Sequence, residues 1–139
     1  MFRSDKLIRF HHCDPAAIVF YPQYFVLFQE LVEDWFADGL GIDYAEFIRV
    51  HRVGLPMAKI ECEFLAPSRM GDTLSLDLAV ERIGTTSIVL AVLGSVGDQQ
   101  KVRATLHLVH VSLASQRPVP IPPELRAGML RYCASDARA

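Results

Sequence analysis

Hydrophobic residues recur along this chain with two different spacings. In the first third they return every three or four positions, which is the spacing of one face of an α-helix. The pattern predicts one long helix over Pro22–Asp38, because a proline is tolerated in the first helical turn and Gly39 and Gly41 supply a stop. The apolar face that this helix must bury consists of Tyr24, Leu27, Phe28, Leu31, Val32, Trp35 and Phe36.

From Arg52 onward, hydrophobic and polar residues alternate with a period of two, which is typical of half-buried β-strands. One more strand is expected before the long helix, a short helix after it, and a closing helix near the carboxyl end. The expected strands are Lys6–His11, Ala58–Phe64, Leu74–Val80, Thr86–Leu93 and Val102–Leu113, and the two shorter helices are Tyr44–Val50 and Pro123–Tyr132.

The order of these elements predicts an α+β fold, in which one long helix packs against one curved antiparallel sheet. Four long strands follow one another with short turns between them, and consecutive strands joined in this way are antiparallel. The chain has 139 residues, which is the length of one domain, so a single domain over residues 1–139 is expected. Such a sheet has two edges, and a long edge strand favours pairing with a second copy of the chain.

Charge and composition exclude several classes of partner. The formal charge is −2, from 14 basic and 16 acidic residues without a basic stripe or tail, so nucleic acid is not an expected partner. The apolar stretches are far shorter than the ~20 residues of a membrane helix, and the polar start Met1–Lys6 does not resemble a signal peptide. Three widely spaced cysteines argue against a disulfide framework, so a soluble, cytoplasmic protein is expected.

The segment Arg9–Tyr24 carries most of the chemistry that the sequence offers. It places the carboxylate of Asp14 in a proline-containing turn and sets Tyr21 at the mouth of the long helix. The first turn of a helix presents unpaired backbone N–H groups and a partial positive charge, which suits the oxyanion formed when a thioester carbonyl is attacked. The amides of Tyr21, Gln23 and Tyr24 are the candidate donors, and the carboxylate would attack the carbonyl or deprotonate a water.

A known family shares this segment. The hotdog-fold acyl-CoA thioesterases, in their 4-hydroxybenzoyl-CoA thioesterase branch, carry the signature Asp-Cys-Asp-Pro-Ala-Gly-Ile-Val-Trp-Tyr-Pro-Asn-Tyr. This chain is similar to it over Cys13-Asp14-Pro15-Ala16-Ala17-Ile18-Val19-Phe20-Tyr21-Pro22-Gln23-Tyr24. The resemblance continues at Gly54-Leu55-Pro56, at Phe64 and in the order of elements. It implies a hotdog fold, a curved antiparallel sheet of about five strands wrapped around the central helix.

The resemblance also implies a function and a site. The family hydrolyses acyl-CoA to free acid and CoA, so the expected substrate is an acyl-CoA, either aromatic such as 4-hydroxybenzoyl-CoA or short to medium aliphatic. Asp14 matches the family's catalytic carboxylate, and Tyr21 matches the residue that opens the central helix and helps orient the carbonyl. The residues then expected to bind substrate are His12, Gln23, Tyr24, Arg82, Thr86 and Ser87.

Assembly and cofactors are implied in the same way. Two subunits would join their sheets edge to edge, in a homodimer or a homotetramer, with the sites at the subunit interface. No metal or redox cofactor is implied, because CoA belongs to the substrate. The chain departs from the family pattern at His12, Ala17 and Gln29, where many relatives carry an aspartate, a glycine and an acid. These departures leave the identity of the acyl group open.

Other interpretations of the same residues stay open. Cys13 lies beside a histidine and an aspartate and would be a nucleophile if its pKa were lowered, although a buried inert cysteine is the commoner case. The run His11–Asp14 offers metal-ligating side chains, but neighbours on a strand point to opposite faces and converge poorly on one ion. The alternative functions are a hotdog enoyl-thioester hydratase or dehydratase, and a non-catalytic acyl-CoA-binding protein.

Overall fold

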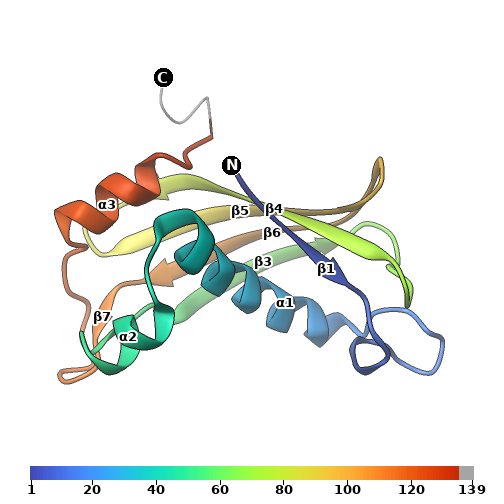
Figure 1. The fold of residues 1–139 in the computed structure, drawn as a ribbon, viewed down its shortest axis with the longest axis horizontal. Coiled ribbons are helices and arrows are strands. Elements are labelled where there is room, and N and C mark those ends of the chain that lie inside the picture. Colours follow the sequence, from blue (N-terminus) through green and yellow to red (C-terminus); the bar gives the residue numbers. More distant parts are fainter. Residues whose placement is uncertain (135–139) are drawn as a thin grey trace.

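The computed structural model describes residues 1–134, and it shows a curved sheet wrapped around one long helix (Figure 1). Five strands form this sheet in the order β1-β4-β5-β6-β3, and every neighbouring pair is antiparallel. Their bounds are β1 Phe2–Leu7, β3 Met57–Phe64, β4 Thr73–Ile83, β5 Ser87–Val96 and β6 Gln99–Val109. The predicted α+β arrangement of one antiparallel sheet and one central helix is therefore confirmed.

The central helix α1 spans Tyr21–Asp34 and continues as a π-helical segment, η2, over Trp35–Leu40. It starts one residue before the predicted position, and it ends at Gly41, whose φ of 68° lies in the left-handed region. The wider turns of η2 bring Gly39 against Trp35, where an added Cβ would lie 2.7 Å from the Trp35 ring atom Cδ1. Only a glycine therefore allows this close approach.

The core lies between α1 and the concave face of the sheet. The helix buries the face predicted from the spacing of its apolar residues. The sheet contributes mainly leucines, which alternate with more exposed residues along β4 and β6 and have almost no exposed surface. The fully buried leucines of these two strands and β5 are Leu74, Leu76, Leu78, Leu90 and Leu106.

Short elements close the two ends of this core. A 3-10 turn, η1, covers Phe10–His12 before α1, and helix α2 covers Tyr44–Arg49 after it. The two-residue strands β2, Val53–Gly54, and β7, Val111–Ser112, pair with each other. Helix α3 spans Pro123–Leu130. In the described part of the chain, no helix is long and apolar enough to cross a membrane.

Two strand predictions were wrong in their boundaries. The first strand is not Lys6–His11, because β1 pairs with β4 from Phe2 opposite Leu78 to Leu7 opposite Thr73. Its half-buried side chains include Ser4 and Lys6, which both bind the carboxylate of Asp34 on α1, so the inward face is too polar for a hydrophobic pattern to reveal.

The last predicted strand, Val102–Leu113, is two strands in the structure. Strand β6 begins earlier, at Gln99, and ends at Val109. The backbone N–H of His110 then donates to the Thr86 carbonyl oxygen at 2.7 Å, and the chain turns away to pair with β2. Apolar residues occupy even positions from Val102 to Leu108 and odd positions from Val109 to Leu113. The alternation therefore changes phase where the pairing partner changes, and the predicted strand joined the two runs.

Candidate active site

The loop between β1 and α1 brings Asp14 close to the start of the helix. The backbone N–H of Asp14 donates to the carbonyl oxygen of Ile18 at 3.0 Å, so the turn closes on itself. The N–H of Phe20, the residue that caps α1, donates to the carbonyl oxygen of His12 at 2.9 Å. These two backbone bonds hold the loop that carries Asp14 against the helix N-terminus.

The Asp14 carboxylate is half-buried and held in one direction. Its Oδ1 accepts a hydrogen bond from the Ala16 N–H at 2.8 Å, which is a local aspartate turn. Within residues 1–134, Oδ2 has no hydrogen-bond or ion-pair partner, so one carboxylate oxygen is left to react. The next residue, Ala17, has a φ of 62°, a left-handed conformation that costs an alanine about 1–2 kcal/mol.

The first turn of α1 contains an amide without an acceptor in the described chain. No side chain caps the helix at Phe20, and Pro22 has no N–H. The N–H of Gln23 already donates to the Phe20 carbonyl oxygen at 2.8 Å, which removes it from the predicted donors. In the described chain the N–H of Tyr21 has no acceptor, so this amide remains to stabilise a developing oxyanion, assisted by the helix dipole.

Tyr24 supports the site from inside the core. Its side chain is 4% exposed, and its hydroxyl donates to Ser68 Oγ at 2.9 Å. Burial raises the pKa of this phenol, so it is a neutral donor. Ser68 is itself fully buried, and its carbonyl oxygen accepts from the Val19 N–H. Ser68, which the sequence analysis did not identify, therefore links the core to the Asp14 loop; an isolated serine carries no signal of this role.

His12 and Cys13 are both held in uncharged forms. His12 is buried, its Nδ1 accepts from the Arg9 N–H at 2.8 Å, and burial together with the neighbouring His11 lowers its pKa. Burial and the adjacent Asp14 carboxylate raise the pKa of the Cys13 thiol, whose Sγ lies 3.4 Å from the Arg9 carbonyl oxygen. A nucleophilic cysteine needs a lowered pKa, so this environment argues against Cys13 as the nucleophile.

Exposed aromatic rings surround the start of the helix. Phe20 contacts Tyr21 with ring centroids 5.4 Å apart, and Tyr21 contacts Phe64 of β3 at 6.1 Å. These three side chains, which we call the aromatic patch, are each about half exposed. Sequence reasoning assigned no function to Phe20 and Phe64, because aromatic residues in an apolar pattern normally predict core.

The remaining predicted substrate-binding residues lie at the other end of the sheet. Along β5 and β6, Ser87 pairs with Val109 and Gly94 pairs with Val102. Val102 is also the residue of β6 that pairs with Phe64 of β3. The seven residues from Ser87 to Gly94 correspond to about 23 Å at ~3.3 Å per residue. Thr86 adjoins Ser87, and Arg82 lies at the end of β4 beside them. One chain alone therefore does not bring these three residues to Asp14.

The side chains that could ligate a metal do not form a common site in the described chain. Residues 1–134 contain no group of three or more histidine, cysteine, aspartate or glutamate side chains that would hold a metal ion. His107 Nε2 lies 3.0 Å from Glu61 Oε1, and His110 Nδ1 lies 3.0 Å from the Val119 carbonyl oxygen, so these two histidines have separate partners. The expectation of a metal-free site stays a prediction.

The curated proteins that this sequence matches are named 1,4-dihydroxy-2-naphthoyl-CoA hydrolases. A 1,4-dihydroxy-2-naphthoyl-CoA hydrolase of Thermosynechococcus vestitus is 27% identical over 125 residues, which are 88% of this chain and 84% of the relative. A 1,4-dihydroxy-2-naphthoyl-CoA hydrolase of Acaryochloris marina is 25% identical over 132 residues, covering 91% and 94% of the two chains. The similarity thus spans nearly the whole of both proteins.

Solved structures share the fold at lower identity. A 1,4-dihydroxy-2-naphthoyl-CoA thioesterase from Synechocystis superposes with a TM-score of 0.84 at 21% identity, over 93% of this chain and 95% of the other. A gentisyl-coenzyme A thioesterase gives 0.84 at 22% identity, over 92% and 99%. The model of one family, described as the thioesterase-like superfamily, matches residues 8–129. With this match over most of its length and the predicted hotdog fold confirmed, the chain belongs to the thioesterase-like superfamily.

Proposed function

We propose that this protein hydrolyses an aromatic acyl-CoA thioester, with Asp14 as the catalytic carboxylate. The class of enzyme, a thioester hydrolase, agrees with the names of its relatives. One observation carries the assignment of the site: a half-buried carboxylate with a free oxygen lies in a loop that backbone hydrogen bonds join to the helix start, where the Tyr21 N–H has no acceptor in the described chain. A nucleophile or base and an oxyanion donor are the two groups that this reaction requires.

The reaction proceeds at the thioester carbonyl carbon. The Tyr21 N–H and the helix dipole stabilise the carbonyl oxygen as it becomes negative. Asp14 Oδ2 either attacks the carbon, giving an anhydride that water then cleaves, or takes a proton from a water that attacks. In both routes the C–S bond breaks, CoA leaves as a thiolate that takes up a proton, and the hydroxyl of water ends on the acid.

Two findings support an aromatic acyl group. The relatives are named for 1,4-dihydroxy-2-naphthoyl-CoA and gentisyl-CoA, which are hydroxylated aromatic thioesters. In this chain the aromatic patch lies at the same helix end as Asp14, and exposed rings offer edge and face contacts to another ring. A 4-hydroxybenzoyl group is a smaller member of the same class.

We also propose that the active unit is a homo-oligomer. Within residues 1–134, strand β3 pairs only with β6, so its outer edge offers unpaired backbone groups to a second copy, and Phe64 and Leu65 at its end are exposed. A second chain placed against this edge would cover the aromatic patch. It is also the simplest source of the Thr86 and Ser87 side chains that one chain holds far from Asp14.

Hydrolysis of an acyl-CoA panel, followed by release of free thiol, tests the proposal. The panel contains 1,4-dihydroxy-2-naphthoyl-CoA, gentisyl-CoA, 4-hydroxybenzoyl-CoA, phenylacetyl-CoA and hexanoyl-CoA, and we expect the aromatic thioesters to be hydrolysed fastest. Asp14→Asn keeps an oxygen to accept from the Ala16 N–H but cannot act as base or anionic nucleophile. We therefore expect kcat to fall by about 10²–10⁴-fold in this variant.

Asp98→Asn is the matched control, because it removes a carboxylate from the exposed turn between β5 and β6. It is expected to leave kcat unchanged. Turnover that survives Asp14→Asn would place the chemistry elsewhere, and hydration of an enoyl-CoA in place of hydrolysis would identify a hydratase. Saturable acyl-CoA binding without turnover would identify a binding protein. Sedimentation at several concentrations checks the oligomer, and a chain that stays monomeric while active would contradict it.

A further inference from the structure

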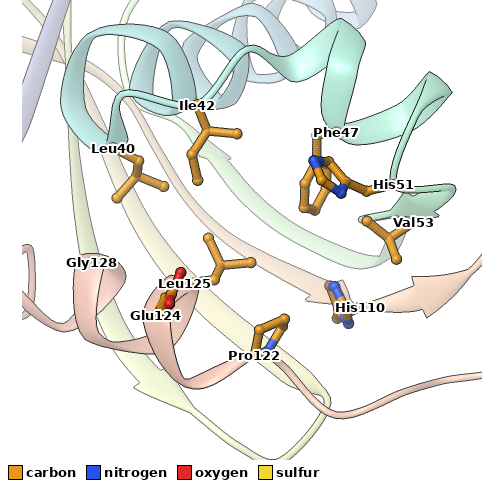
Figure 2. Close-up of a pocket in the computed structure, with 10 residues that line it drawn as sticks. All are labelled: Leu40, Ile42, Phe47, His51, Val53, His110, Pro122, Glu124, Leu125 and Gly128. Carbon is orange, nitrogen blue, oxygen red and sulfur yellow. The ribbon is translucent and has the colours of Figure 1, made fainter.

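A cavity of about 420 Å³ lies at the end of the molecule away from Asp14. Figure 2 shows it between the segment that follows α1, with Leu40 and Ile42, and helix α3, with Leu125. Phe47 of α2 and Val53 of β2 complete a mostly apolar wall. The volume falls within the range of about 300–1,000 Å³ that is usual for small-molecule sites.

One buried polar atom beside this wall lacks a partner in the described chain. His110 lines the cavity and is 2% exposed. Its Nδ1 lies 3.0 Å from the Val119 carbonyl oxygen, and because a carbonyl can only accept, Nδ1 carries the ring proton. Nε2 of the neutral ring is then a hydrogen-bond acceptor. Within residues 1–134 it has no hydrogen-bond partner, which is unusual for a buried polar atom in a folded protein.

We propose that this cavity binds a small, neutral, mostly apolar molecule with one hydroxyl group, a phenol or an alcohol, whose O–H donates to His110 Nε2 after a small shift of the side chains that cover this nitrogen. The apolar wall would bury the body of the ligand, and the hydroxyl would satisfy the unpaired acceptor. A ring fits this space well, because the Phe47 and His110 rings lie on the same wall with centroids 6.1 Å apart.

Charges at the rim favour a neutral ligand over an acid. Glu124 is exposed at the edge of the cavity. His51, also on the edge, lies 3.8 Å from Glu46 Oε1, so a second carboxylate offsets any positive charge on its ring. An anionic group entering here would be repelled by both glutamates, whereas a hydroxyl would not.

This site is separate from the one proposed for catalysis. His110 follows Val109, which pairs with Ser87, and the other end of β6 pairs with Phe64 beside the aromatic patch. The eight residues from Val102 to His110 correspond to about 26 Å of strand at ~3.3 Å per residue. The binding proposal therefore stands whether or not Asp14 is the catalytic residue.

Titration of the full chain with two matched probes tests the proposal. p-Cresol and p-xylene have nearly the same shape, but the first carries a hydroxyl where the second has a methyl group. We expect p-cresol to bind about tenfold more tightly, because only p-cresol satisfies the buried acceptor. In nitrogen-15 spectra of the histidine rings, p-cresol should shift the Nε2 signal of His110, and p-xylene should not.

Variants at Gly128 and His110 test the cavity and the hydrogen-bond acceptor independently. Gly128→Met places a flexible side chain in the cavity from a helical position, and an added Cβ there meets nothing closer than Leu40 Cδ2 at 3.4 Å. It should abolish binding of both probes, whereas Ala127→Met, on the exposed side of the same helix, should not. Thermal unfolding of both variants verifies that they fold, and the loss of a helical glycine should itself raise stability.

His110→Asn retains a donor near Nδ1 for the Val119 carbonyl and deletes Nε2. In this variant p-cresol should bind no better than p-xylene. Three results would overturn the proposal: equal binding of the two probes to the natural chain, binding that persists in Gly128→Met, or no binding of either probe up to millimolar concentration. The shift of the His110 Nε2 signal decides the question in the natural chain even if a variant fails to fold.

Discussion

The two ends of helix α1 are built from different interactions. At its start, backbone and side-chain hydrogen bonds hold the Asp14 loop, and the rings of the aromatic patch stay about half exposed. At its other end, Trp35 and Phe36 are buried among the rings of Tyr44, Phe47 and Tyr132, with centroids between 5.1 and 5.9 Å apart. At the first end, which we call the open end, reactive polar groups and rings are exposed. At the second, the packed end, the large side chains of Trp35 and Phe36 are buried, next to the cavity between α2 and α3.

This difference shows how a small domain combines stability with a reactive surface. Close packing at the carboxyl end of α1 contributes hydrophobic stabilisation without exposing reactive groups. That stabilisation allows the other end to keep costly features, namely a left-handed alanine, an unpaired amide and exposed rings. Variants at the two ends should therefore differ in the size of their effects on stability.

The largest loss of stability is expected at the packed end. Phe36 is fully buried against three other rings, so Phe36→Ala should lower the free energy of unfolding by about 3–5 kcal/mol, through lost burial and an unfilled cavity. Urea unfolding measures this directly. Phe10→Ala, at a ring that is 80% exposed at the open end, should change stability by less than about 0.5 kcal/mol. Equal losses in the two variants would remove the contrast between the ends.

A smaller loss is expected where a buried hydrogen bond holds the open end. Tyr24→Phe removes the hydroxyl that donates to Ser68 Oγ at 2.9 Å and leaves that buried oxygen without its partner, at a cost of about 1–2 kcal/mol. Ser68→Ala should cost a similar amount. The double variant should cost clearly less than the sum, because both changes delete the same bond. Additive losses in urea unfolding would show that the two groups do not depend on each other.

A gain in stability is expected within the Asp14 loop. Ala17→Gly should raise the free energy of unfolding by about 0.5–1 kcal/mol, since glycine adopts a φ of 62° without the strain of a Cβ. Thermal unfolding provides the measurement, and Ala16→Gly is the neighbouring control. Ala16 has no positive φ, so glycine there only adds freedom to the unfolded chain and should destabilise. A loss in Ala17→Gly would mean that the turn is not strained.

The smallest effect is a dependence of stability on pH at the open end. Burial holds the pKa of His12 below its ordinary 6.5 in the folded chain. The unfolded chain therefore binds a proton at a higher pH than the folded chain, and the free energy of unfolding falls as the pH drops below about 6.5. His12→Asn, which retains an acceptor for the Arg9 N–H, should flatten this slope between pH 7 and 5. An unchanged slope would assign the pH dependence to other groups.

Hydrophobic spacing predicted the long helix and four of the sheet strands, because burial on one face imposes the period directly. It misplaced the first strand, where Ser4 and Lys6 face α1 and bind Asp34 instead of burying apolar surface. The same spacing merged β6 and β7, since alternation resumes in the opposite phase at Val109 with no glycine or proline between the two runs. Errors therefore occurred where polar contacts or long-range pairing decide an element's limits.

The site was predicted only in part. Asp14 and Tyr21 were proposed from the resemblance of their segment to a family signature; the structure brings their segments together at one helix end, and their catalytic roles stay a prediction. Neither Ser68 nor the exposed state of Phe64 has a local signal, because each depends on residues distant in the sequence. Whether Arg82, Thr86 and Ser87 bind substrate stays a prediction.

The sequence by itself determined which segments form helix and strand, the single apolar face of α1 and the family to which the chain belongs. These properties depend on local spacing and on a contiguous motif. Only the tertiary structure decided that the Asp14 loop is joined to the start of α1, that Ala17 is left-handed and that His110, beside a cavity, has an unpaired buried nitrogen. Hydrogen bonding and burial join residues far apart in the chain, so the fold alone assigns them.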